Sequence, residues 1–596
     1  MNPPDPTDPS DADDSPKRPR VQRRFVRTTL CCAAIVVAGL IAYSDSFYGP
    51  FIFDDSGFVA LVSMKKLPIR RILAGPRPVV DLTFALNDSL GGMDVDGYHL
   101  LNLTIHVLAA LTLFGVVRRT LELPVLARRF GERASTPVAF CIALLWMLHP
   151  LLTQSVTYIA QRTESLMGLF FLLTLYGFIR AAISPRPGAW RAGAVAACAL
   201  GMGSKQVMVA APLLALLYDR SFIAGSFREA LRQRWGLHLA LAATWLILAG
   251  SVRGAFGGHP ESAGFALSGV TPLLYARSEP GVILHYLRLV FWPSGLSLDY
   301  GWPAAESARE IAPGAIAVGI LLAATLWALV RRPMWGFLGA WFFLILAPTS
   351  SFMPLRDLAF EQRMYLPLAA VVALAVLAAH RLGERLAARL WASEEERRQA
   401  RTAAAIVLML PLTVALGCRT YVRNGDYRSA ISIWSAAKEV RPQNPRAWNN
   451  LGEACFRAGR YDEAKADCTE AIRLKPDYAD AFNNRGLACA GTNFLDEALR
   501  DYDEAIRLNP NLADAYLNRG NAYDDLGRRE DALREYGRAI EANPDDRLIY
   551  INRAMTYCRM KEYAKALADL QKFEDLGGVP PEPFLAEVAR AARQAP

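Results

Sequence analysis

Residues 476–510, PDYADAFNNRGLACAGTNFLDEALRDYDEAIRLNP, run from one proline to the next, and the pattern recurs on both sides with a period of 34 residues. The positions that keep this period are Pro442, Pro476, Pro510 and Pro544; Trp448, Phe482, Tyr516 and Tyr550; Ala430, Ala464, Ala498, Ala532 and Ala566; and Gly452, Gly486 and Gly520. Small residues on one helix of each period can pack against aromatic residues on the other. Because one helix pair cannot bury its apolar face alone, the periods are predicted to stack into an α-solenoid.

This pattern is the signature of tetratricopeptide repeats, and four full repeats are present. A half repeat with Tyr427, Ala430, Trp434 and Ala437 precedes them. We therefore expect a repeat domain over residues 419–578 and a C-terminal cap or tail over 579–596. The first helix of the half repeat is expected to continue from the last apolar span.

One column of the repeats is polar without a packing reason, and it consists of Asn450, Asn484, Asn518 and Asn552. One asparagine on the first helix of each pair would form a ladder along the superhelix. An amide offers both a donor and an acceptor, so such a ladder can bind an extended peptide backbone whatever its sequence. Alternatively, each asparagine satisfies a neighbouring loop. We favour the peptide-binding interpretation.

The sequence before about Arg419 consists mainly of long apolar runs, and 53% of all 596 residues are hydrophobic. Runs of nearly the 20 or so apolar residues needed to cross a bilayer are predicted to be membrane spans. They lie near residues 28–43, 99–117, 136–152, 164–183, 189–204, 206–222, 236–252, 312–330, 333–349, 364–380 and 402–418. The predicted fold class is all-α, with a polytopic helical membrane domain of about 11 spans over residues 25–418, followed by the tetratricopeptide α-solenoid.

Charge predicts the orientation of this membrane domain. Residues 1–24 are expected to be a disordered cytoplasmic tail, because they begin with a Pro-, Asp- and Ser-rich stretch with almost nothing to bury. The stretch Val282–Trp292 is short and ends at Pro293, so we expect it to be re-entrant or interfacial rather than a span. Eleven spans then place most loop arginines inside, as the positive-inside rule requires.

The protein is therefore predicted to be a multi-pass plasma (inner) membrane protein with a cytoplasmic N-terminus and periplasmic or otherwise extracytoplasmic repeats. The net charge of +9 fits this membrane orientation better than nucleic-acid binding, so membrane lipids are expected partners and nucleic acid is not.

The loop after the first span contains Phe51-Ile52-Phe53-Asp54-Asp55-Ser56. Two adjacent carboxylates at a membrane edge cost free energy unless they are solvated or paired, so Asp54 and Asp55 are candidates for function. The alternative is that they cap an interfacial helix through its free N–H groups. The predicted topology puts them on the same side as the repeats.

Three basic residues next to span ends, Arg77, Lys205 and Arg363, lie on the outer side, against the charge bias. They either extend toward lipid headgroups or bind a phosphate or pyrophosphate group. The sequence leaves both interpretations open.

Histidines in the spans raise the question of a metal site. His99, Asn102 and His106 share one helical face, but the two histidines are about 10 Å apart along the helix axis and cannot bind one metal ion alone. We favour interhelical hydrogen bonding, and no metal ligands are predicted. His149-Pro150 marks either a broken-helix site or the simple end of a span.

Several short segments, taken in order, resemble a known family. The matching segments are Phe53-Asp54-Asp55, Arg77-Pro78, Gly97-Tyr98-His99-Leu100-Leu101-Asn102, His149-Pro150, Gln161-Arg162-Thr163-Glu164, Ser204-Lys205-Gln206 and Gln362-Arg363-Met364-Tyr365-Leu366-Pro367. With about eleven spans and the repeats, the chain resembles the transmembrane-and-tetratricopeptide O-mannosyltransferase family of the GT-C glycosyltransferase superfamily. Family members often have Lys-Glu where this chain has Lys205-Gln206, so an acidic role is lost there.

The resemblance implies sugar transfer from a polyprenyl-phosphate donor to Ser or Thr of protein acceptors at the outer face. Asp54 and Asp55 would be catalytic, with Asp55 as the general base on the acceptor hydroxyl. Arg77, Lys205 or Arg363 would stabilise the leaving lipid phosphate, and the repeats would bind acceptor proteins or peptides. No cofactor is certain, and a need for a divalent metal stays open.

Two other classes of protein compete with this interpretation. A membrane-anchored tetratricopeptide scaffold would mediate protein–protein interaction without catalysis, and it would not need the outer-face carboxylates and basic residues. A transporter is a weaker alternative, because the sequence shows no inverted repeat of broken spans.

Overall fold

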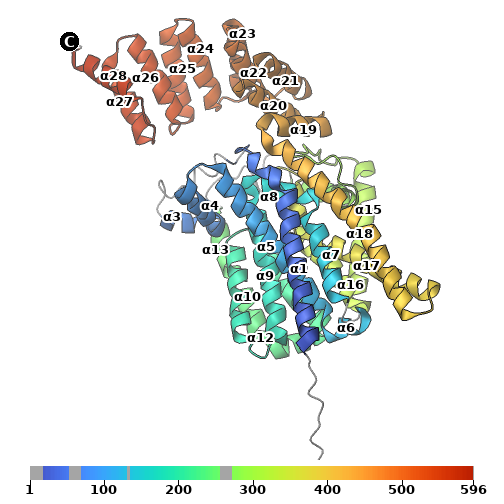
Figure 1. Ribbon diagram of the computed structural model, residues 1–596. Helices are drawn as coiled ribbons and strands as arrows, with labels where there is room; N and C mark the ends of the chain where they lie inside the picture. The colour runs from blue at the N-terminus through green and yellow to red at the C-terminus, as the bar shows by residue number, and fades with distance from the viewer. Residues whose placement is uncertain (1–17, 53–54, 56–68, 131–133, 256–270, 595–596) are drawn as a thin grey trace, which may run out of the picture. The chain divides into compact units, whose positions relative to one another are not determined.

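The computed structural model describes residues 18–52, 55, 69–130, 134–255 and 271–594 (Figure 1). Every regular element in these ranges is a helix, which confirms the predicted all-α class. The chain forms two compact units. The first comprises residues 1–294 and 304–427, and the second comprises residues 295–303 and 428–596.

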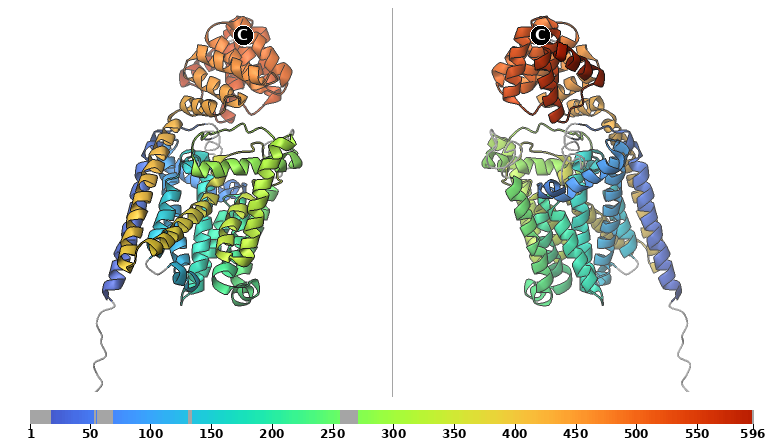
Figure 2. Two further views of the ribbon diagram at one scale, coloured as in Figure 1. Left: turned by 90° about the vertical axis from the view of Figure 1, so that its right-hand side faces the viewer. Right: turned by 90° about the vertical axis from the view of Figure 1, so that its left-hand side faces the viewer.

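Most of the long helices in the first unit run roughly parallel to one another (Figures 1 and 2). The long helices are α1 (Arg18–Ala42), α5 (Val95–Leu121), α9 (Arg162–Ile183), α14 (Pro272–Phe291), α15 (Ala308–Arg331), α17 (Pro367–Leu390) and α18 (Glu394–Gly425). Shorter α-helices join them: α3 (Ile69–Ala74), α4 (Pro78–Gly91), α6 (Pro124–Phe130), α7 (Ser135–Met147), α8 (Thr153–Thr157), α10 (Gly188–Met202), α11 (Ala210–Tyr218), α12 (Phe227–Ala243), α13 (Trp245–Ala255) and α16 (Pro333–Leu346).

Seven of the eleven predicted spans coincide with helices long and apolar enough to cross a membrane. An eighth, near residues 136–152, falls on α7 and the short helices that follow it, which are bent by 54° at His149-Pro150. The other three fall on shorter helices: α10, the broken pair α12–α13, and α16. The described part of the chain therefore has seven long apolar helices, or eight with the bent pair, rather than eleven of full length. Apolar composition located the helices, but it could not tell a full span from a shorter buried helix.

The stretch around Val282–Trp292 is part of the 20-residue helix α14. Thr271 caps its N-terminus by accepting a hydrogen bond from Leu274, and Pro272 fits the first helical position. In Figure 2 this helix lies across the ends of neighbouring long helices rather than alongside them. Its interfacial placement stays a prediction.

Several polar side chains inside the first unit form hydrogen bonds to other segments of the unit. His106 contacts the Tyr365 hydroxyl at 2.9 Å and the Met147 carbonyl at 3.1 Å. The Trp146 indole donates to the Tyr365 carbonyl at 2.8 Å, and the rings of these residues pack edge to face. Such bonds remove the cost of burying polar atoms among apolar helices.

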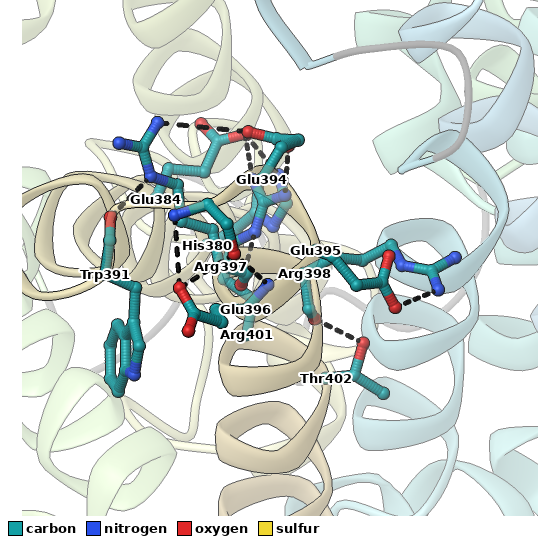
Figure 3. Close-up of polar contacts among 11 residues, drawn as sticks. His380, Glu384, Trp391, Glu394, Glu395, Glu396, Arg397, Arg398, Arg401 and Thr402 are labelled. Carbon is teal, nitrogen blue, oxygen red and sulfur yellow. Dashed lines mark hydrogen bonds and ion pairs between the residues drawn. The ribbon is translucent and has the colours of Figure 1, made fainter.

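A network of charged residues closes the turn from α17 to α18 (Figure 3). Ser393 and Glu396 form a capping box at the start of α18, and Arg397 donates to the Trp391 carbonyl at 2.8 Å. Arg401 forms ion pairs with Glu394 and Glu384 at 3.2 and 3.7 Å. These exposed pairs add little stability one by one, but the capping box defines where α18 begins.

The second unit is the predicted solenoid. Its helices are α19 (Ala430–Val440), α20 (Pro445–Arg457), α21 (Tyr461–Leu474), α22 (Ala479–Gly491), α23 (Leu495–Leu508), α24 (Ala513–Asp525), α25 (Arg529–Ala542), α26 (Arg547–Arg559), α27 (Tyr563–Asp575) and α28 (Glu582–Gln594). Four helix pairs follow the single helix α19, and α28 packs on the last pair through Phe584, Leu585 and Val588.

The packing between small and aromatic residues is as the period predicts. A side chain added at Gly486 would lie 2.6 Å from the Tyr502 ring, and one at Gly520 would lie 2.7 Å from the Tyr536 ring. The recurring alanine Ala532 is completely buried. Since these rings fill the space above glycine, the two helices of a pair approach closely.

Candidate functional site

Asp55 is fully buried, and its carboxylate is fixed by two backbone donors. Its Oδ2 accepts from the Ile52 N–H at 3.1 Å, within the same turn, and its Oδ1 accepts from the Ala160 N–H at 2.7 Å. The carboxylate therefore joins the segment after the first span to the residues just before α9. Asp54, the other predicted catalytic residue, lies outside the described residues.

Arg162, at the start of α9, organises the helices around Asp55. It is completely buried and donates to Asn102 Oδ1 at 2.6 Å, Asn87 Oδ1 at 2.7 Å and the Tyr98 carbonyl at 3.1 Å. Its guanidinium also lies 4.2 Å from the centre of the Phe84 ring. One side chain thus ties α4, α5 and α9 together, and it interacts electrostatically with Asp55.

Lys205 forms an ion pair with Glu164, and both side chains are mostly buried. Glu164 belongs to the same short segment as Ala160 and Arg162, so residues 159–164 support Asp55 and Lys205 together. Sequence analysis quoted this segment but gave Glu164 no role. The carboxylate partner of Lys205 therefore comes from another helix, α9.

Arg77 is brought to this ion pair by a close approach of two loops. It immediately precedes α4, and the Val79 N–H donates to the Gly203 carbonyl at 3.1 Å. A side chain at Gly203 would lie 2.8 Å from Val79, so the approach requires glycine. Arg77 interacts electrostatically with both Glu164 and Lys205.

The charges of this cluster shape its chemistry. Burial lowers the pKa of Lys205, Glu164 opposes that shift, and Arg77 lowers the pKa further. Burial likewise lowers the pKa of Arg77. Arg77 interacts electrostatically with Asp81 as well as with Glu164, so the cluster contains two cations and two carboxylates.

Arg363 also influences Lys205 electrostatically, but its guanidinium is already well held. Its Nη1 donates to the Leu358 carbonyl at 2.7 Å and the Tyr275 hydroxyl at 3.1 Å, and its Nη2 donates to the Asp357 carbonyl at 2.6 Å. It also forms an ion pair with Glu279 at 3.4 Å. The structure thus brings the three predicted phosphate-binding residues into one region, with Arg363 the most firmly bound.

Asp81 is a titratable group that sequence analysis missed. It lies one turn into α4 after Arg77, and its N–H donates to the Arg77 carbonyl at 3.0 Å. Burial raises the pKa of Asp81 to about 6, and Arg77 opposes that shift. No sequence motif marked this residue.

The polar face of α5 takes part in the predicted interhelical hydrogen bonds. His99 bonds the Gly49 carbonyl at 2.8 Å, and Asn102 donates to the Val156 carbonyl at 3.1 Å. Among the residues that the structure describes, no group of three or more His, Cys, Asp or Glu side chains is placed to bind a metal ion.

The asparagine column of the repeats is half-buried and partly engaged in bonds between repeats. Asn484 Nδ2 donates to Asn449 Oδ1 at 3.0 Å, and Asn518 Nδ2 donates to Asn483 Oδ1 at 2.9 Å. Asn552 Nδ2 donates to the Leu548 carbonyl of its own helix at 2.8 Å. Some amide donors of the column therefore join neighbouring repeats, and its peptide-binding role stays a prediction.

A unit of long apolar helices with buried ion pairs, in one chain with a tetratricopeptide solenoid, defines a polytopic membrane protein with a repeat domain. Tetratricopeptide-repeat family models match residues 419–479 and 513–546, and a TPR-repeat model matches residues 493–527. Protein O-mannosyl-transferase Tmtc3 of Drosophila melanogaster is 25% identical over 523 residues, covering 74% of this chain and 54% of that protein.

Protein O-mannosyl-transferase F38B6.6 of Caenorhabditis elegans is 23% identical over 471 residues, covering 72% of this chain and 61% of that protein. The chain is thus similar over most of its length to the transmembrane-and-tetratricopeptide O-mannosyltransferase family, which confirms the resemblance seen in the motifs. It spans between half and two thirds of the length of these two relatives.

Solved structures of repeat proteins are also similar. The crystal structure of MamA is 23% identical, covering 27% of this chain and 93% of that chain with a TM-score of 0.24. YrrB, described as a TPR protein with an unusual peptide-binding site, is 24% identical, covering 27% of this chain and 81% of that chain with a TM-score of 0.22.

Proposed function

We propose that this protein is a membrane glycosyltransferase that transfers a sugar from a polyprenyl-phosphate carrier to Ser or Thr hydroxyls of proteins at the outer membrane face. The observation that carries the proposal is that residues 159–164 hold a buried carboxylate and a buried cation together, through Ala160 to Asp55 and through Glu164 to Lys205. The similarity to proteins named O-mannosyl-transferases supports the reaction class.

In the proposed reaction, the carboxylate and the cations of the site have separate roles. Asp55 takes the proton of the acceptor hydroxyl while its oxygen attacks the anomeric carbon of the sugar. The bond from that carbon to the carrier phosphate oxygen breaks, and Arg77 and Lys205 stabilise the negative charge on the departing lipid phosphate. Asp54 is proposed as a second catalytic carboxylate, and Arg363 as a support for the phosphate side of the site.

The test is transfer to an acceptor by purified protein in lipid nanodiscs. Asp55→Asn keeps the size of the side chain but removes the base, so transfer should fall by roughly 100-fold or more. Asp96→Asn, at an exposed carboxylate in the first turn of α5, is the control and should transfer like wild type. Full transfer by Asp55→Asn would instead support a scaffold without catalysis.

We further propose that Asn450, Asn484, Asn518 and Asn552 bind the acceptor backbone. Replacing all four by Ala should weaken acceptor-peptide binding, measured by fluorescence anisotropy on the intact protein. The control is the double variant Asn449→Ala, Asn483→Ala, which removes the same bonds between repeats from the other side. If the control loses as much affinity as the quadruple variant, the column is structural and does not bind peptide.

A further inference from the structure

The segment Gly295–Pro303 lies between α14 and α15 in the sequence, yet it packs as part of the second unit. Leu296, Leu298 and Tyr300 are almost completely buried, with 3%, 2% and 1% of their surface exposed. A nine-residue stretch without helix or strand buries its side chains this fully only where a partner surface is shaped to receive it.

Asp299 is the polar centre of the segment. Both of its carboxylate oxygens accept from the Arg446 guanidinium, with Nη2 to Oδ1 at 2.6 Å, and Oδ1 also accepts from the Gly301 N–H at 2.8 Å. Burial alone would raise the pKa of Asp299, but Arg446 lowers it below the ordinary value. Paired, two-pronged bonds of this kind are among the strongest and most directional in proteins.

The flanking residues complete the fit. The Arg441 guanidinium lies 4.6 Å from the Trp302 ring centre and 5.6 Å from that of Tyr300. Gly301 has φ +46, and a side chain there would lie 2.5 Å from Asn444, so only glycine fits. Arg441 and Asn444 belong to the connection between α19 and α20, and Arg446 lies in the first turn of α20.

The helix that leads into this segment also serves the candidate site. Tyr275 and Glu279 on α14 contact Arg363, and α14 ends at Phe291, four residues before the second unit's segment begins. One helix therefore connects a predicted phosphate-binding residue, through continuous chain, to the first helices of the repeats.

We propose that Gly295–Pro303 is a strap through which the α14–α15 connection holds the first repeat helices, and that Asp299 is a positioning residue for acceptor delivery. The second part rests on the proposed glycosyl transfer. The repeats are then attached at three points of the chain, at residues 294–295, 303–304 and 427–428. Three attachments restrict the motion of a domain far more than one flexible linker does.

The physical test is hydrogen exchange, followed by mass spectrometry, on the full chain in nanodiscs. Asp299→Arg or Arg446→Asp should each speed exchange in residues 295–303 and 430–457 by roughly tenfold or more, because each leaves a desolvated charge without its partner. The double variant restores the pair with reversed charges and should recover most of the protection. The matched control is Arg457→Asp on the same helix, whose pair with Glu453 is exposed and should not matter.

The functional test uses the same variants. Each single variant should raise the acceptor KM by roughly tenfold, in line with the lost protection, and should leave donor-lipid hydrolysis without acceptor unchanged. The charge-reversed double variant should recover the KM. Unchanged exchange in both single variants would overturn the strap, and changed exchange with unchanged KM would overturn the positioning role. If the wild-type protein transfers no sugar but the variants show the expected changes in hydrogen exchange, the proposed reaction is wrong and the strap is not.

Discussion

The basic residues of the candidate site differ in what already binds them. Lys205 has one carboxylate partner, whereas Arg363 has two carbonyls, a hydroxyl and the Glu279 carboxylate. Lysine cannot reproduce that set of bonds, because its three donors radiate from a single atom.

We therefore predict that Arg363→Lys destabilises the fold by about 1–3 kcal/mol, because lysine keeps the charge beside Glu279 but leaves buried carbonyls without their donors. The measurement is the melting temperature of detergent-solubilised protein. Arg356→Lys, at an exposed arginine of the same loop, is the control and should melt like wild type. An Arg363→Lys protein as stable as wild type would mean that these bonds contribute little to the fold.

Asp81 gives a pH-dependent prediction. Its pKa is raised from 3.8 to about 6, so its neutral form is favoured in the folded protein. The stability from this group is present in full below about pH 4 and is lost as the pH rises through about 6. Asp81→Asn should remove this pH-dependent loss of stability, because asparagine cannot ionise. The variant should therefore melt at a higher temperature than wild type at neutral pH, but not at a pH below the ordinary pKa of aspartate. Equal melting temperatures at both pH values would contradict the raised pKa.

At the scale of single elements, two glycines of the solenoid should respond in opposite directions. Gly520→Ala places a methyl group 2.7 Å from the Tyr536 ring, while Gly537 on α25 has no atom within 4 Å of an added side chain. Overpacking costs about 1–3 kcal/mol, and alanine gains about 1 kcal/mol over glycine in a helix. Gly520→Ala should thus lower, and Gly537→Ala raise, the urea midpoint of the repeat unit. Two variants with the same sign would contradict this packing.

The repeats were predictable from sequence because their contacts are local and recur every 34 residues. The contacts of Lys205 with Glu164 and of Asp55 with Ala160 could not be predicted from the sequence. Their partners are 41 and 105 residues apart, respectively, and follow no period. The hydrogen bonds of His99 and Asn102 could be anticipated, because helical spacing places both residues on one face. Polar side chains on a buried helix face need hydrogen-bond partners, even when the sequence does not show which segment supplies them.

At the scale of the whole molecule, hydropathy located all eleven helical regions but overestimated how many are long enough to span. The strap could not be foreseen, because its polar and aromatic residues look like those of any loop. The orientation of the chain rests on loop charges, and it can be tested directly.

With the N-terminus inside and the repeats outside, a reporter active only in the cytoplasm and fused after Pro596 should be silent. The same reporter fused at the N-terminus should be active, which controls for expression. An active C-terminal fusion would mean that the repeats lie in the cytoplasm. Either the repeats and Asp55 would then lie on opposite sides of the membrane, or the whole protein would have the reverse orientation. Both results would contradict the proposed site of transfer.

The discontinuous second unit has a consequence for recombination between relatives. A hybrid made with a single crossover at residues 427–428 would inherit its repeats from one parent and residue 299 from the other. Arg446 would then meet whatever side chain the foreign parent carries there. The smallest exchangeable module therefore consists of two separate pieces of the gene, and substitutions at residues 299 and 446 should be inherited together.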